Sequence, residues 1–172
     1  MMKRNIIVGE KIFFTGLGLI LLFMLSHDWI PLGPFNDIQG VRAENTTSGL
    51  IQMTIINALS ISVVIVITLL FIGKRYPIWA RLWLIIHLGS ILYGAISAWW
   101  ISYLFGAEPE MIERYNIMFG NTHAFLPVMN GIVPNTIHVL FHVTLLMTWI
   151  LSIYISFKKV EKIGVLKVLR VM

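Results

Sequence analysis

The sequence has no cysteine, few charged residues and none of the short motifs that mark the common catalytic sites. Without cysteine the chain forms no disulfide bond, no thiolate metal site and no cysteine nucleophile. It also lacks a Gly-x-Ser-x-Gly motif, a phosphate-binding glycine loop and a His-Glu-x-x-His zinc motif. Any chemistry must therefore come from histidine, carboxylate and other polar side chains.

The scarcity of charge indicates the class of protein. Charged residues make up 12% of the 172 residues and hydrophobic residues make up 58%. Soluble domains average about 25% charged and roughly 45–50% apolar residues, so this composition is typical of a membrane protein. The length fits one domain, and we expect residues 1–172 to form a single membrane domain.

Four stretches that are almost free of charge have the length of a membrane-spanning helix, which is about 20 residues. The first follows Lys3, Arg4 and Lys11 and resembles a signal peptide, but no small-residue cleavage site follows it. We therefore expect an uncleaved first span. The expected spans cover residues of about 12–32, 50–73, 82–105 and 135–157.

The segments 33–49 and 106–134 then become loops on one side of the membrane, and the second is too long to be a mere connector. Glu108 and Pro109 could begin a short helix that ends near Gly120. Its apolar residues would form one stripe, so we expect an amphipathic helix on the membrane surface or over the bundle. The stripe contains Met111, Ile112, Tyr115, Met118 and Phe119.

The distribution of positive charge predicts the orientation. Of the 13 Lys and Arg residues, all but Arg42 and Arg114 lie at the N-terminus, in the turn after the second span or in the basic tail 158–172. The positive-inside rule therefore predicts four spans with both termini in the cytoplasm. The expected fold is an all-α, up-down, four-helix integral membrane bundle. Because the basic residues serve orientation and contact with membrane lipid, we expect no nucleic-acid partner.

Several short motifs are spread over the chain: His27-Asp28-Trp29-Ile30-Pro31-Leu32-Gly33, Ala98-Trp99-Trp100, Arg114-Tyr115, Met118-Phe119-Gly120, Thr122-His123, Asn130-Gly131-Ile132 and Pro134-Asn135-Thr136 with His138. Together they resemble a group of small uncharacterised bacterial four-helix membrane proteins. This resemblance implies a multi-pass protein of the bacterial cytoplasmic membrane, the cell inner membrane, and attaches no activity to it.

Two histidines are candidates for metal binding. His138 and His142 lie four residues apart on one face of the last span, which is a spacing that lets two imidazoles hold one metal ion. With His27, His123 or a loop carboxylate they would offer three or four ligands to a divalent transition metal such as zinc, copper or iron. The alternative is that both histidines make hydrogen bonds between helices.

Carboxylates beside these histidines could support acid–base catalysis at the outer end of the bundle. The candidate catalytic residues are His27, Asp28, His123 and Glu113. The alternatives are that Asp28 caps a helix or pairs with His27, and that Glu113 belongs to the solvated face of a surface helix.

A cofactor or apolar ligand near the middle of the membrane is a further alternative. A quinone or similar molecule could be held by His87 or Asn57 and stacked on Trp149. Haem held by His87 and His142 is less favoured, because helix counting places the two residues about 10 Å apart in depth. We expect Trp149 to pack on the third span, and Trp99, Trp100 and Tyr103 to form an aromatic belt.

Two polar or small-residue faces should lie between helices. One contains Gln52, Thr54, Asn57 and Ser60 on the second span, and the other contains His87, Ser90, Gly94 and Ser97 on the third.

Three functions remain open at this point. The first is a polar site at the outer leaflet that performs metal-assisted chemistry on, or binds, a lipid-soluble small molecule. The second is a non-enzymatic accessory subunit whose outer loops bind a membrane protein partner. A channel or transporter ranks third, because the spans after the first contain no Asp, Glu, Lys or Arg that would mark a path for ions.

Overall fold

A computed structural model of the chain describes residues 5–158, and the structure of this part is helical, without a β-strand. Four helices are long and apolar enough to cross a membrane: α1 (Val8–Ser26), α3 (Thr47–Phe71), the continuous helix Ile78–Phe105 and α7 (Thr136–Phe157). The expected all-helical fold with four helices of membrane-spanning length is confirmed. Lys3, Arg4 and the expected basic tail beyond Lys158 lie outside the described residues.

The first span lies closer to the N-terminus than the expected range of 12–32. It begins at Val8, because the Glu10 carboxylate accepts a hydrogen bond from the Ile7 backbone N–H (3.1 Å) and closes the first turn. It ends at Ser26, where the backbone N–H groups of Trp29 and Ile30 both donate to the Ser26 carbonyl. The chain leaves the helix there, so His27 and Asp28 lie beyond the span.

The third span also begins earlier than expected and is not a uniform α-helix. It consists of α4 (Ile78–Ala95), a π-helical segment η2 (Ile96–Ile101) and α5 (Ser102–Phe105). Segments of π-helix are rare and occur often at functional sites. Their wider turns rotate the side chains that follow, and here the segment carries Trp99 and Trp100.

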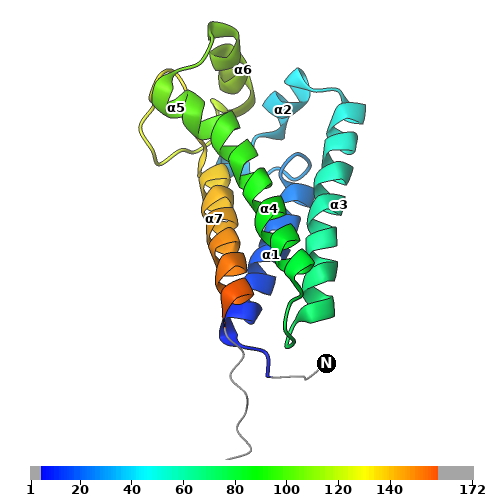
Figure 1. Ribbon diagram of the computed structural model, residues 1–172. Helices are drawn as coiled ribbons and strands as arrows, with labels where there is room; N and C mark the ends of the chain where they lie inside the picture. Colours follow the sequence, from blue (N-terminus) through cyan, green and yellow to red (C-terminus); the bar gives the residue numbers. More distant parts are fainter. Residues whose placement is uncertain (1–4, 159–172) are drawn as a thin grey trace, which may run out of the picture.

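Short helices cover one end of the bundle (Figure 1). The amphipathic helix expected after Glu108 is confirmed as α6 (Pro109–Phe119). The first loop, expected to be irregular, contains η1 (Gly33–Phe35) and α2 (Ile38–Glu44). The helices α2 and α6 pack closely together at Gly40. A side chain added at this position would collide with the backbone of Ile117 and Met118.

The opposite end of the bundle holds the α3–α4 turn, the beginning of α1 and the end of α7 (Figure 1). There the buried Glu10 carboxylate accepts a hydrogen bond from the Gly73 backbone N–H (3.2 Å) in the turn. Gly9 lies against the ring of Tyr154 on α7. Helix α1 packs against α3 and α7, and α4 packs against α7.

Apolar side chains fill the space between the four long helices. Two glycines allow close approach: Gly16 of α1 lies against Thr148 of α7, and Gly89 of α4 lies against Trp149. The expected small-residue face was wrong at Ser90 and Gly94, which are exposed. Fully buried core residues include Phe13, Leu17, Ile20, Ile61, Leu84, Leu88 and Leu145.

The expected polar face of the second span is confirmed in part. Thr54 accepts a hydrogen bond from the Trp29 indole (2.9 Å), and Ser60 contacts Nε2 of His87 (2.7 Å). Asn57 is half-buried, whereas Gln52 is exposed, so the prediction was wrong for Gln52. This face of α3 therefore contacts Trp29, in the turn that follows α1, and then His87 of α4.

Candidate functional site

A cavity of about 210 Å³ lies beneath α2 and α6, at the end of the bundle that they cover. It is bounded by the end of α1, the beginning of α3, the π-helical segment and α7. Two histidines and an aspartate therefore share a space that is otherwise largely apolar. The lining residues are His27, Asp28, Val41, Asn45, Leu50, Met53, Trp99, Arg114, Tyr115, Met118, Phe119 and His138.

His27 and Asp28 form a close pair at this cavity. His27 donates a hydrogen bond from Nδ1 to the Phe23 carbonyl (3.0 Å), which is an acceptor only. Its other nitrogen, Nε2, lies 3.2 Å from Oδ1 of Asp28. The two residues form an ion pair when His27 is an imidazolium, and Asp28 can carry the proton instead. The pair can release or take up a proton.

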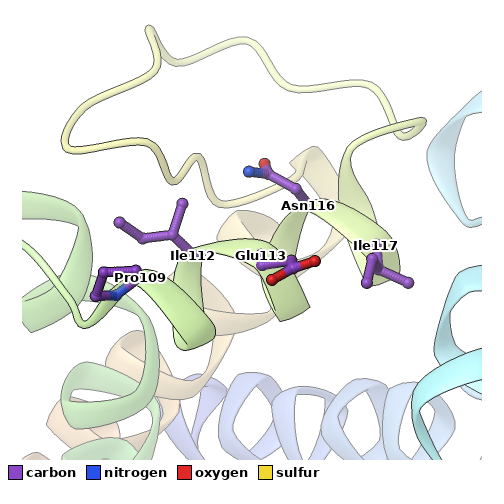
Figure 2. Close-up of a pocket in the computed structure, with 5 residues that line it drawn as sticks. All are labelled: Pro109, Ile112, Glu113, Asn116 and Ile117. Atoms are coloured by element: carbon purple, nitrogen blue, oxygen red, sulfur yellow. The ribbon is translucent and has the colours of Figure 1, made fainter.

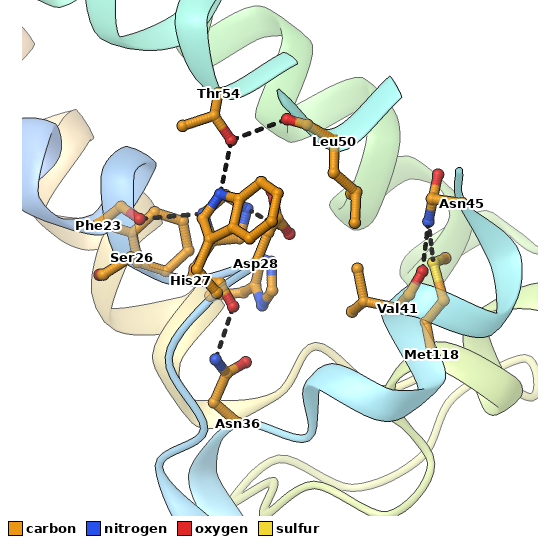
Figure 3. A network of polar contacts seen from close by, with 12 residues as sticks. Phe23, Ser26, His27, Asp28, Asn36, Val41, Asn45, Leu50, Thr54 and Met118 are labelled. Carbon is orange, nitrogen blue, oxygen red and sulfur yellow. Dashed lines mark hydrogen bonds and ion pairs between the residues drawn. The ribbon is translucent and has the colours of Figure 1, made fainter. Parts of the chain in front are cut away.

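The surroundings of Asp28 favour its protonated form. The residue is buried, and burial raises the pKa of the Asp28 carboxyl group from its usual 3.8, while the neighbouring His27 lowers it by a smaller amount. The segment is fixed by Asn36, whose side-chain amide donates to the carbonyls of His27 (2.6 Å) and Ile30 (2.8 Å) (Figure 3). The expected His–Asp pair is therefore present and rigidly held.

Asn135 determines which nitrogen of His138 carries the hydrogen. Oδ1 of Asn135 caps α7 by accepting the His138 backbone N–H (3.0 Å), which identifies this atom as the oxygen of the amide. The same oxygen lies 2.6 Å from Nδ1 of His138, so Nδ1 must be the donor. In the uncharged imidazole the lone pair is then on Nε2. His138 lines the cavity and Asn135 does not. Because Asn135 engages the Nδ1 edge of the ring, the edge that carries Nε2 is the one available to the cavity.

His142 has the opposite arrangement. The Trp100 indole N–H donates to Nδ1 of His142 (3.1 Å), and an indole nitrogen donates only. The uncharged His142 therefore carries its hydrogen on Nε2 and has its lone pair engaged by Trp100. The rings of His138 and His142 lie 6.2 Å apart, so the two residues are neighbours with different proton roles.

Aromatic rings surround both histidines. The ring centre of Trp99 lies 4.5 Å from that of His138, 4.7 Å from Tyr115 and 4.9 Å from Phe119. The Phe23 ring stacks on His27 at 4.4 Å. The expected aromatic belt was wrong for Trp99 and for Tyr103, which are only 7% and 4% exposed. The π-helical segment directs Trp99 inward.

Helix α6 closes the cavity from above. The Tyr115 hydroxyl donates to the Ala98 carbonyl, and Arg114 donates to Oδ1 of Asn45 (3.3 Å) and lies 3.8 Å from the Glu44 carboxylate. Burial also raises the pKa of the Tyr115 hydroxyl, with a smaller opposing effect of Arg114. Helix α6 is therefore tied both to the third span and to α2.

The apolar stripe of α6 faces inward in part. Tyr115, Met118 and Phe119 are half-buried and line the cavity, and Asn45 donates to the Val41 carbonyl (2.8 Å) and to the Met118 sulfur (3.8 Å) (Figure 3). An open groove of about 570 Å³ lies along another face of the helix (Figure 2). It is lined by Pro109, Ile112, Glu113, Asn116 and Ile117.

Two of the four candidate catalytic residues are not in the cavity. His123 is exposed, contacts Thr136 through Nδ1 (2.8 Å) and lies beside the Phe35 ring. Glu113 is exposed and lines the groove on α6. The structure brings together His27, Asp28 and His138, but it places His123 and Glu113 elsewhere.

The candidate cofactor-binding residues lie deeper in the bundle and are engaged with the protein. His87 contacts Ser60 and stacks on Trp83, with 5.4 Å between ring centres. Trp149 donates to the Ile85 carbonyl (3.0 Å), which confirms that it packs on the third span. Asn57 is half-buried on α3.

Metal binding by His138 and His142 stays a prediction. Within residues 5–158, no three His, Asp or Glu side chains are grouped so that they could hold one ion. Nδ1 of His138 and Nδ1 of His142 both take part in hydrogen bonds within the protein, and in its uncharged form His142 offers a hydrogen and not a lone pair on its remaining nitrogen.

Sequence analysis missed Trp99 and Trp100 as parts of the site, and it expected Tyr115 and Asn135 only as members of a loop, 108–135, that covers the site. A signal existed only for Asn135, because an N-cap asparagine three residues before a histidine places both hydrogen-bonding groups in one turn. Comparisons of the chain with models of protein families, with curated proteins and with solved structures found no match.

Proposed function

We propose that this protein binds the polar head of a lipid-soluble small molecule at one boundary of the membrane. The observation that carries the proposal is the cavity in which the His27–Asp28 pair and His138 face a common space walled by Trp99 and Phe119. Ligand sites combine mostly apolar walls with a few fixed polar groups in this way. Each polar group here is held by a second residue, which is also characteristic of a preformed site.

The dimensions of the cavity favour a head group and not a whole ligand. Pockets for drug-sized molecules occupy about 300–1,000 Å³, and this cavity measures about 210 Å³. Met53, on the lining, is 54% exposed on the outer surface of α3. A lipid-soluble molecule can therefore place its polar end in the cavity while its apolar part passes Met53 into the membrane.

The same proposal includes the orientation in the membrane. The excess of Lys and Arg at the N-terminus, in the α3–α4 turn and at the C-terminal end supports cytoplasmic termini in a bacterial cytoplasmic membrane. The cavity beneath α2 and α6 then opens at the outer leaflet. There the His27–Asp28 proton would be available for acid–base chemistry on the bound molecule, which is how a catalytic function would arise.

Identification of co-purified molecules tests the proposal. The protein is purified in a mild detergent, its bound molecules are extracted with organic solvent, and they are identified by mass spectrometry. We expect a molecule present in wild type and depleted in Asp28→Asn and His138→Phe. The matched control is His123→Phe, because His123 lies outside the cavity. Equal recovery of every extracted molecule from all four proteins would contradict the proposal.

The groove along α6 favours a second candidate function, an accessory subunit that binds a membrane protein partner. Its lining combines the apolar Ile112 and Ile117 with the charged Glu113, and interfaces commonly combine an apolar centre with a polar rim. Ile117→Arg should abolish partner binding in cross-linking of intact membranes, while the cavity variant His138→Phe should retain it. The reverse pattern would assign the partner to the cavity end.

A further inference from the structure

We infer that the cavity selects a ligand with a hydroxyl group that donates a hydrogen bond, so that the ligand class is a neutral, lipid-soluble phenol or alcohol. The inference rests on the proposed binding function and adds the chemistry of the head group. It follows from the hydrogen bonds that His138, Asp28 and their neighbours already make within the protein.

His138 presents a lone pair to the cavity. Its Nδ1–H is used by Asn135, whose oxygen can only accept, and in the uncharged ring Nε2 is left as an acceptor. The residue is 7% exposed and lines the cavity. A bound ligand covers this nitrogen, so a ligand that donates a hydrogen bond is favoured over one that leaves the covered acceptor without a donor.

Asp28 presents a second acceptor whichever residue of the pair holds the proton. Oδ1 lies 3.2 Å from Nε2 of His27, and either residue can carry the proton of the pair. If Asp28 is ionised, Oδ2 is a carboxylate oxygen, and if Oδ1 is protonated, Oδ2 is a carbonyl oxygen. Both forms of Oδ2 accept a hydrogen bond. Asp28 and His138 both line the cavity, so its wall holds two acceptors.

Several donors on the cavity wall are already engaged. The Tyr115 hydroxyl donates to the Ala98 carbonyl, and the Asn45 amide donates to Val41 and Met118. Arg114 donates to Asn45 and faces Glu44. A ligand with only acceptors, such as an ether, would leave His138 Nε2 and Asp28 Oδ2 without a donor.

The charges at the cavity favour a neutral donor over a cationic one. The His27–Asp28 pair carries no net charge in the two proton arrangements that share one hydrogen, and Arg114 places a positive charge at the wall. An ammonium head would be repelled by Arg114 and would lose its hydration among Trp99 and Phe119. A hydroxyl group donates one hydrogen at a lower cost of burial.

Two pairs of probes test the inference in nanodiscs. The first is 4-octylphenol against its methyl ether, 4-octylanisole, and the second is dodecanol against its methyl ether. Each probe is added at matched mole fractions in the lipid, and its affinity is obtained from the rise in the thermal unfolding midpoint. We expect the hydroxyl compound of at least one pair to bind about tenfold more tightly than its ether, since an unpaired buried group costs about this much.

The pattern of outcomes separates the inference from the proposed function. A preference for the phenol only, or for the alcohol only, supports the inference and identifies the source of the hydroxyl group. Equal binding of hydroxyl compound and ether in both pairs overturns the inference and leaves the proposed binding function intact. Absence of binding by all four probes overturns the inference, and the proposed function fails only if no molecule co-purifies with the cavity either.

A pair of variants localises the preference. His138→Phe keeps an aromatic ring and removes the acceptor, so the preference for hydroxyl should fall from about tenfold to less than about twofold. His123→Phe makes the same replacement outside the cavity and should retain the wild-type preference. An unchanged preference in His138→Phe would overturn the role of His138. If His138→Phe does not fold, the wild-type comparison of probes still decides the inference.

Discussion

The half of the bundle near the α3–α4 turn and the half beneath α2 and α6 differ in what fills the space between their helices. Near the turn, aliphatic and phenylalanine side chains such as Phe13, Leu17 and Leu84 are fully buried. Beneath α2 and α6, the helices are separated by histidines, tryptophans and a cavity. Close packing of apolar side chains dominates one half, and hydrogen bonds that hold polar side chains dominate the other.

This difference shows how one helix can serve both stability and a site. Helix α7 packs through Leu145, Thr148 and Ile155 in one half and carries His138 and His142 in the other. In lipid, close packing and interhelical hydrogen bonds hold helices together, because burial of apolar surface provides little drive. The two halves should therefore respond differently to substitution.

The largest expected effect is that of Trp99→Ala, which removes the ring at the centre of the aromatic cluster. Its contacts with His138, Tyr115 and Phe119 are lost, and the expected destabilisation is about 3–5 kcal/mol. Reversible unfolding in detergent measures it. The matched control is Trp79→Ala, since Trp79 is 56% exposed, and it should change stability by about 0.5 kcal/mol or less. Similar losses for both would contradict the inward role of Trp99.

Gly16→Val tests whether the other half depends on close approach of helices. The added side chain would meet Thr148 of α7, and the expected destabilisation is about 1–3 kcal/mol. Gly18→Val is the matched control, because nothing lies within 4 Å of a side chain there. Both are measured by the same unfolding assay. Each folded variant should retain the cavity ligand. Loss of the ligand from folded Gly16→Val protein would contradict the view that the two halves are independent.

Asn135→Ala should have a smaller effect on stability and a specific effect on His138. Loss of the α7 cap costs about 0.5–2 kcal/mol, and Nδ1 of His138 loses its acceptor. The ¹⁵N chemical shifts of labelled histidine should then report a change in the tautomer of His138. Thr46→Ala removes the cap of α3, where the hydroxyl accepts from the Gly49 N–H, and should leave the histidine shifts unchanged.

The smallest expected effect is the pH dependence contributed by Asp28. Its pKa is raised in the folded protein from 3.8, so the folded state holds this proton more tightly than the unfolded state. The stability that it contributes is then largest below pH 3.8 and is lost as the pH rises through the raised pKa. Thermal unfolding of wild type and Asp28→Asn across this range measures the difference. Parallel pH profiles of the two proteins would contradict a raised pKa.

Much of the fold could be predicted from the sequence, because span length, charge distribution and the Glu108-Pro109 helix start are local signals. The four long helices and α6 are confirmed. The limits of the first span were missed because the turn at Ser26 is held by Asn36, which lies ten residues further along the chain. Helix α2 was missed because Asn36-Asp37 and Gly40 indicate a turn when read alone.

The candidate site could be predicted only in part. Helical spacing placed His138 and His142 on one face, and adjacency in sequence paired His27 with Asp28. His123 and Glu113 were expected at the same end of the bundle, but they lie outside the cavity. The position of a loop side chain depends on backbone turns and long-range contacts that no periodic pattern records.

The amino-acid sequence is sufficient to predict the class of this protein. It is an all-helical chain with four helices long and apolar enough to cross a membrane, and its polar side chains gather toward one end. These properties follow from composition and helical periodicity, which act along the chain. Three further features depend on how the helices pack: Trp99 turns inward, α2 and α6 cover a cavity, and His138 and His142 carry their hydrogens on different nitrogens. Those outcomes depend on partners far apart in sequence, which meet only when the helices pack.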